Sequence, residues 1–106
     1  MIPAKLRDNI FFLGFLTESA SEQFERFLAL ANRKQIRAIK EIIRNLVKGN
    51  IQLPSEEVEN LKHLRKIILK IDHLTRLHSV KRFLLSHWLA VKQIFSYISV
   101  MTLLQS

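Results

Sequence analysis

The chain contains no cysteine among its 106 residues. This absence excludes a disulfide framework, a thiolate nucleophile and a cysteine-based zinc site, so the fold depends on packing alone. Only two glycines and two prolines interrupt the chain, while 48% of its residues are hydrophobic. This composition is incompatible with simple disorder and predicts an all-α protein with few breaks. Because the chain is too short for a second independent core, we expect residues 1–106 to form a single helical domain.

Acidic residues are also scarce. Nine Asp and Glu oppose 17 Lys and Arg, which gives a formal net charge of +8. The imbalance lies in the middle of the chain, where residues 32–82 carry 13 basic and 5 acidic side chains. An excess of this size favours a polyanionic partner, either nucleic acid, an anionic membrane or an acidic protein, and predicts binding that weakens with salt.

The sequence lacks the residue patterns of an enzyme. It has no nucleophile with an adjacent base and no glycine-rich phosphate loop, and its one acidic cluster, at 56–59, fits the start of a helix. The four histidines have no spacing that places two on one helical face beside a carboxylate. We therefore predict a non-enzymatic protein without a cofactor or a metal site. The histidines are His63, His73, His78 and His87.

Two helices are predicted before the basic region. The first spans residues 4–16 and has too many apolar side chains for one narrow stripe, so we expect burial on more than one side. Its basic start and apolar run resemble a secretory signal, but the polar residues Asp8 and Asn9 favour keeping it in the fold. A second helix is expected from Ala20 to Ala31, with Ser19 and Glu22 as a capping box.

The next segment, residues 33–48, has the clearest pattern in the chain. Asn32 and Gln35 fit a capping box at its start, and Gly49 fits a left-handed C-terminal cap. At 3.6 residues per turn its aliphatic side chains share one face and its cations share the opposite face. The expected inner residues are Ile36, Ile39, Ile43, Leu46 and Val47.

A following helix is predicted over residues 55–72, with Ser55 as its N-cap. Its apolar seam and that of the preceding helix should pack together, which makes residues 33–72 an antiparallel basic hairpin at the centre of a bundle of four or five helices. The residues expected to hold this hairpin together are Ile39, Ile43, Leu61, Leu64 and Ile68.

A hydrophobic C-terminal helix is predicted over residues 80–104. It fits three interpretations: a core helix of the bundle, a surface for self-association, or a membrane-active helix. A spanning helix needs about 20 apolar residues, and Lys92 near its centre would be costly there. A helix lying on a bilayer surface is therefore the more plausible form of the membrane interpretation.

The order of these features in residues 35–86 resembles a small basic protein of Polinton-type elements and adintoviruses, which is commonly likened to the basic core peptide of adenoviruses. The matching residues are, in the turn, Lys48, Gly49, Asn50, Ile51 and Leu53; in the second helix, Leu61, Leu64, Arg65 and Leu69; and in the last cluster, Ser79, Lys81, Arg82, Leu84 and Leu85. Family members usually continue with Gly-Gly-Phe, whereas this chain has His87 and Trp88.

This resemblance implies a virion or element-encoded structural protein, located in the virion or the host nucleus, that binds nucleic acid and forms an oligomer. We expect non-specific contacts with phosphates, because the connector from Gly49 to Ser55 is longer than the turn of a helix-turn-helix reader. The residues predicted to bind nucleic acid are Arg33, Lys34, Arg37, Lys40, Arg44, Lys48, Lys62, Arg65, Lys66, Lys70, Lys81 and Arg82.

Two alternatives remain open at this stage. The chain could be an interaction module whose apolar groove receives a helix of a host or virion protein. It could also act on membranes through its C-terminal helix. A contiguous apolar patch on the folded surface would favour the first alternative.

Overall fold

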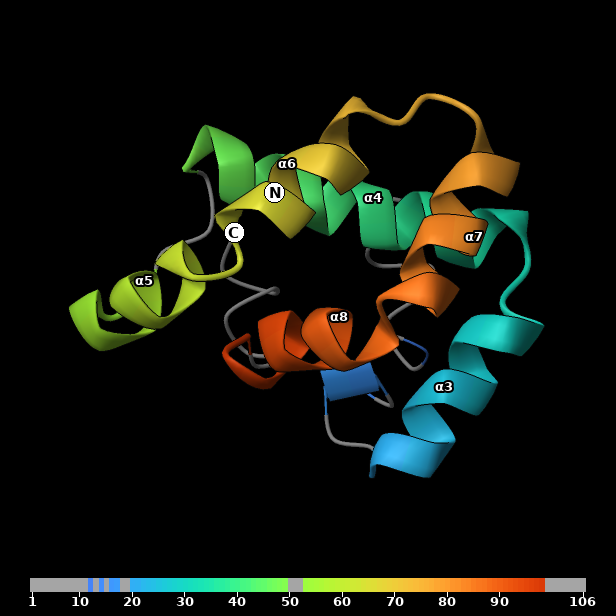
Figure 1. The fold of residues 1–106 in the computed structure, drawn as a ribbon, viewed down its shortest axis with the longest axis horizontal. Coiled ribbons are helices and arrows are strands. Elements are labelled where there is room, and N and C mark those ends of the chain that lie inside the picture. Colours follow the sequence, from blue (N-terminus) through green and yellow to red (C-terminus); the bar gives the residue numbers. More distant parts are fainter. Residues whose placement is uncertain (1–11, 13, 15, 18–19, 50–52, 99–106) are drawn as a thin grey trace.

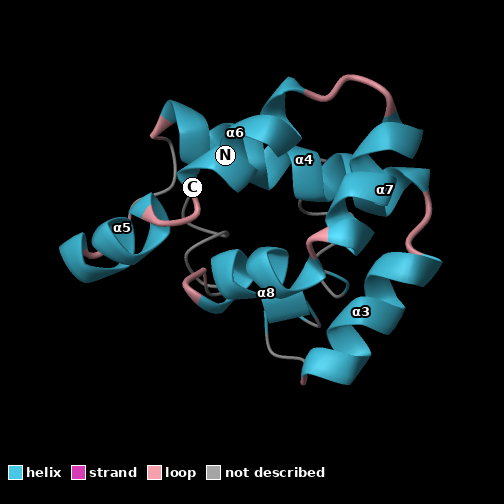
Figure 2. Cartoon of the chain, viewed as in Figure 1, coloured by secondary structure: helices cyan, strands magenta, loops and turns pink. Residues whose placement is uncertain are grey.

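The computed structural model describes residues 12, 14, 16–17, 20–49 and 53–98. Six labelled helices lie within these residues (Figures 1 and 2). They are α3 (Ser21–Leu30), α4 (Arg33–Lys48), α5 (Ser55–Lys62), α6 (Arg65–His73), α7 (Leu77–Ser86) and α8 (Trp88–Ser96). The all-α prediction is confirmed. The predicted helix at 4–16 lies largely outside the described residues, although Phe12 and Leu16 are buried.

Helix α3 begins after Ala20, which makes no side-chain cap hydrogen bond. The predicted capping residue Ser19 lies outside the described residues. The buried side chains of Phe24 and Leu28 are four residues apart on one face, and α3 packs through this face against α7 and α8. Ala31 is the C-cap residue of this helix, and the chain continues from it directly into α4.

Helix α4 has the bounds and both caps that the sequence predicts. The Asn32 side chain accepts a hydrogen bond from the Gln35 backbone N–H, and the Gln35 side chain accepts one from the Asn32 backbone N–H, each at 2.8 Å. Gly49 adopts φ 75° and ψ 18°, the left-handed conformation that glycine takes without steric cost. Local side-chain chemistry thus determines both ends of this helix.

Helix α4 is also the central helix of the bundle, because it packs against both α6 and α7. Ile36, Ile39 and Ile43 are buried as predicted, while Leu46 is only half-buried and Val47 is exposed. Ala38 and Ile42 are buried as well, which the one-sided seam in the sequence did not predict. Contact with two neighbouring helices explains this wider buried arc.

The predicted helix at 55–72 is divided into α5 and α6. The break lies at His63 and Leu64, and Leu64 leaves helical geometry at φ −104° and ψ 8°. Helix α6 runs antiparallel to α4 and contacts it more extensively than any other helix does, whereas α5 projects from the bundle (Figure 1). The predicted hairpin is therefore formed by α4 and α6 alone. Pro54, not Ser55, occupies the N-cap position of α5.

The predicted helix at 80–104 is divided as well. Helix α7 begins earlier, at Leu77, and the break before α8 lies at His87. The His87 ring stacks on Phe83 with ring centroids 4.2 Å apart, and its Nδ1 lies 3.1 Å from the Phe83 carbonyl oxygen. These local contacts stabilise the turn. Residues 99–104 lie outside the described residues.

The buried core joins α8 to the rest of the chain. Val91, Ile94 and Phe95 are fully buried, and the Phe95 ring lies 6.2 Å from that of Phe24 on α3, centroid to centroid. Of the three interpretations of the C-terminal segment, this packing supports the core helix for residues 88–96. Within the described part of the chain, no helix has the length and apolar character needed to cross a membrane.

Candidate nucleic-acid interface

Five cations form a continuous strip on the outer side of α4. At roughly 100° per residue, they fall within an arc of about 80°, opposite the buried isoleucines. Lys40 is half-buried and the other four are exposed. We call this set the α4 strip; it consists of Arg33, Arg37, Lys40, Arg44 and Lys48.

Three members of the α4 strip line a hollow of about 290 Å³. Arg37, Lys40 and Arg44 form one wall. Thr75, between α6 and α7, and Leu77, the first residue of α7, line the hollow as well. This volume lies just below the range of about 300–1,000 Å³ typical of small-molecule sites. Guanidinium, ammonium and hydroxyl groups are common donors to phosphate oxygens. The side chains that line the hollow therefore include donors suited to phosphate oxygens.

Two acidic side chains lie beside this hollow. Glu41 lines it, and the Nε atom of Arg44 lies 3.4 Å from Oδ1 of Asp72. The Arg44 side chain remains 50% exposed in this pair. The Asp72 side chain is 18% exposed, so this carboxylate offsets part of the positive charge at the Arg44 end of the hollow. Within the described residues, this is the one ion pair formed by the α4 strip.

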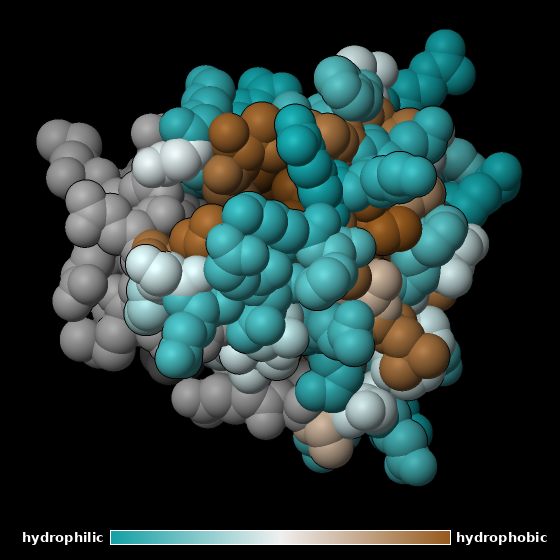
Figure 3. Space-filling model, turned by 60° about the vertical axis from the view of Figure 1, so that its left-hand side comes forward, coloured by the Kyte–Doolittle hydropathy of each residue, from teal (hydrophilic) through white to brown (hydrophobic). Residues whose placement is uncertain are grey.

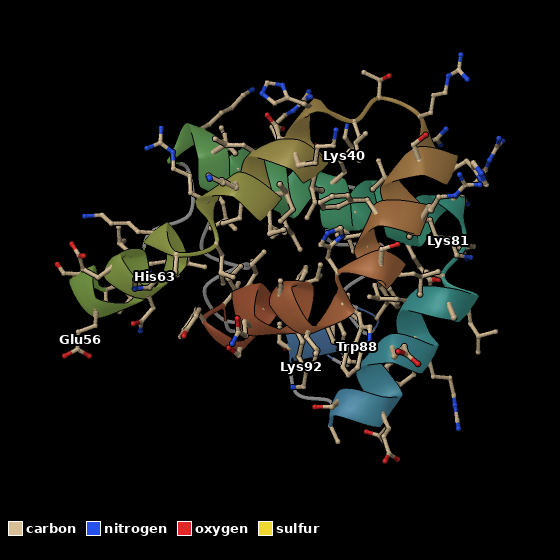
Figure 4. All side chains as sticks on the ribbon, in the orientation of Figure 1. Lys40, Glu56, His63, Lys81, Trp88 and Lys92 are labelled. Atoms are coloured by element: carbon tan, nitrogen blue, oxygen red, sulfur yellow. The ribbon has the colours of Figure 1, made fainter. Side chains whose placement is uncertain are left out.

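Helix α7 brings Lys81 and Arg82 close to the beginning of α4. The Lys81 Nζ atom donates a hydrogen bond of 3.0 Å to the carbonyl oxygen of Ala31, the C-cap residue of α3. The ammonium thus satisfies a free carbonyl at the negative end of a helix, and Lys81 has a structural role there. Figure 4 shows Lys40 and Lys81 in the half of the view that contains α4 and α7, whereas Lys92 lies on α8.

Arg82 lies in a separate shallow hollow on α7. His78, Lys81 and Leu85 share this hollow with it. One guanidinium nitrogen of Arg82 lies 3.3 Å from Nε2 of His78, one helical turn earlier. Arg82 is exposed and follows Lys81, whose ammonium contacts Ala31 just before α4.

The remaining predicted residues lie elsewhere. Lys34 is exposed in the first turn of α4 and extends the strip sideways. Lys66 and Lys70 are exposed on the side of α6 that faces away from the buried Ile68 and Ile71.

Two further predicted cations, Lys62 and Arg65, line an apolar groove and not the basic hollow. Lys62 Nζ donates a hydrogen bond of 2.8 Å to Oε1 of Glu59, and this contact with Lys62 lowers the pKa of the Glu59 carboxyl below its usual value. The structure therefore places Lys81 beside the start of α4 and places Lys62 and Arg65 along a separate groove.

The sequence reasoning did not select Thr75 and Arg76. Thr75 lines the hollow, and the exposed Arg76 is the N-cap residue of α7, between Thr75 and Leu77. Both belong to the segment in which the helical pattern weakens. The weakened helical pattern together with Arg76 is the signal that could have drawn attention to this segment. No group of three or more His, Asp or Glu suited to a metal ion lies within the residues that the structure describes.

Comparison of the chain with protein-family models, with curated proteins and with solved structures gives no match.

Proposed function

We propose that this protein binds nucleic acid without sequence preference, through phosphate contacts made by the α4 strip. The observation that carries the proposal is the convergence of Arg37, Lys40 and Arg44 on a hollow that Thr75 also lines. The strip extends this hollow along α4, which has 16 residues. At 1.5 Å per residue the helix is about 24 Å long, a length that spans several phosphates of a duplex.

The burial of α4 favours contact with the phosphate backbone of the nucleic acid over contact with its bases. A recognition helix enters the major groove and presents side chains to base edges there. Helix α4 is instead the centre of the bundle, enclosed by α6 and α7 on two sides, and it exposes only a narrow arc. An arc of long cationic side chains can reach phosphates without entering a groove. We therefore propose binding that depends on charge density and not on base sequence.

The resemblance to the basic proteins of Polinton-type elements and adintoviruses suggests the setting of this activity. We propose that the protein accompanies the DNA of such an element, in the virion or in the host nucleus, as an oligomer. Lys66 and Lys70 of α6 are exposed and lie outside the α4 strip, so they give a second copy or a second duplex further points of contact.

Fluorescence anisotropy with two labelled 20-base-pair duplexes of unrelated sequence tests the proposal. We expect the two dissociation constants to agree within about threefold at each salt concentration. Both should rise on the order of 100-fold or more between 50 and 200 mM salt, because each phosphate contact adds about 0.9 to the slope of log affinity against log salt. Affinity that differs strongly between the duplexes, or that does not change with salt, would contradict the proposal.

A further inference from the structure

An apolar groove lies between the C-terminal end of α4, helix α5 and helix α6. Its volume is about 440 Å³. Helix α5 forms one wall and projects away from the bundle in Figure 1. In Figure 3, where this side is turned forward, apolar atoms lie in a recess between hydrophilic side chains. The apolar residues that line the groove include Leu46, Val47, Leu53, Val58, Leu61 and Leu69.

The groove exposes side chains that a closed bundle would bury. Val47 on α4 is 42% exposed and Val58 on α5 is 46% exposed. Burial of apolar surface contributes about 25 cal/mol per Å², so an occupant that covers both walls gains a favourable contact. Because the two walls belong to separate helices, an apolar ridge from a third helix can lie between them.

The charged side chains that line the groove are both cations, Lys62 and Arg65. Both are exposed. Lys62 is paired with Glu59 at 2.8 Å, whereas Arg65 has no acid within ion-pair distance among the described residues. The whole chain carries a net charge of +8, which attracts an acidic partner from a distance. An occupant that complements this groove therefore has an aliphatic face with carboxylates beside it.

We propose that this groove binds an amphipathic helix of another protein, with aliphatic residues at positions i, i+3, i+4 and i+7 and with Asp or Glu along the edge of that face. Helix α5 has eight residues and is about 12 Å long, which matches two turns of such a helix. The groove is distinct from the α4 strip, so this interaction does not depend on the proposed binding of nucleic acid.

Titration of the full chain with model peptides tests this inference. The first peptide is a labelled helix with four Leu at i, i+3, i+4 and i+7 and flanking Glu. The second has the same composition in scrambled order, and the third has Lys in place of Glu. We expect the first to bind at least tenfold more tightly than the other two. Equal binding of all three peptides would overturn the proposal.

Two variants of the chain locate the binding. Val58→Asn should weaken binding of the first peptide at least tenfold and leave DNA affinity unchanged. Leu89→Asn is the matched control, because Leu89 is also an exposed apolar residue, at 62%, on another helix. Arg65→Glu should weaken binding of the Glu peptide and strengthen binding of the Lys peptide. A general loss of folding would weaken binding of both peptides.

Two results would overturn the inference. One is an equal loss of affinity in Val58→Asn and Leu89→Asn. The other is a dimer of the chain, detected by light scattering, that dissociates in the Val58→Asn variant, together with no binding of any peptide. In that case the groove would hold a second copy of the chain.

Discussion

Simultaneous reversal of charge by Arg37→Glu, Lys40→Glu and Arg44→Glu is expected to reduce affinity for duplex DNA on the order of 100-fold at 50 mM salt. The three side chains line one hollow, so the variant replaces its cationic wall with an anionic one. The slope of log affinity against log salt should also decrease by about 2.7, which corresponds to three lost phosphate contacts at roughly 0.9 each. Anisotropy titrations over a salt series measure both quantities.

A matched single substitution controls for the change in net charge. Arg37→Glu and Arg26→Glu each replace an exposed helical arginine by glutamate, but Arg26 lies on α3 beside Glu22 and Glu25. Arg37→Glu should reduce the salt slope by about 0.9, the value of one phosphate contact. Arg26→Glu should leave the slope unchanged. An equal change of the salt slope in both variants would mean that DNA affinity depends only on the total charge of the protein and that the α4 strip has no special role.

Truncation of a core side chain on α8 is expected to reduce the stability of the fold strongly. Phe95→Ala should destabilise the protein by about 3–5 kcal/mol, the usual cost of removing a buried aromatic ring. Phe95 is fully buried and packs against Phe24 of α3. Since small domains have a total stability of about 5–15 kcal/mol, this loss would leave the variant only marginally folded. Urea denaturation followed by circular dichroism measures the free energy of unfolding.

Leu89→Ala, on the same helix, serves as the control for this prediction. Leu89 is 62% exposed, so its truncation should change the free energy of unfolding by no more than about 0.5 kcal/mol. Similar losses in the two variants would show that α8 does not pack in its own chain as described. A Phe95→Ala loss that disappears on dilution would instead place this side chain in an interface between subunits.

The sequence predicts an element well where local chemistry determines its ends. Asn32, Gln35 and Gly49 fix both ends of α4, and both caps are recognisable from residue types and spacing. The breaks at Leu64 and His87 have no proline or glycine to mark them. At His87 the turn is accompanied by a side-chain contact with Phe83, four residues earlier, which residue types alone do not reveal. Helical propensity in the sequence is a weak guide at such positions, because packing commonly overrides it.

In the candidate interface, too, the sequence predicts what a single helix determines and not what depends on the packing of several helices. Periodicity places the cations of α4 on one outer face, because a helix alone determines that arrangement. It could not show that α5 turns away from α4, which places Lys62 and Arg65 along an apolar groove and not beside the α4 strip. Nor could it show that Thr75 joins the hollow, because the path of the α6–α7 segment depends on the whole bundle.

The most direct test of the proposed interface is a map of backbone amide chemical shifts during titration of the ¹⁵N-labelled full chain with a short duplex. We expect the largest changes in the exposed residues of α4 and in the segment from Thr75 to Arg82, with little change in α3 and α5. The largest changes in α3, or in the groove between α5 and α6, would contradict a phosphate-binding role for the α4 strip.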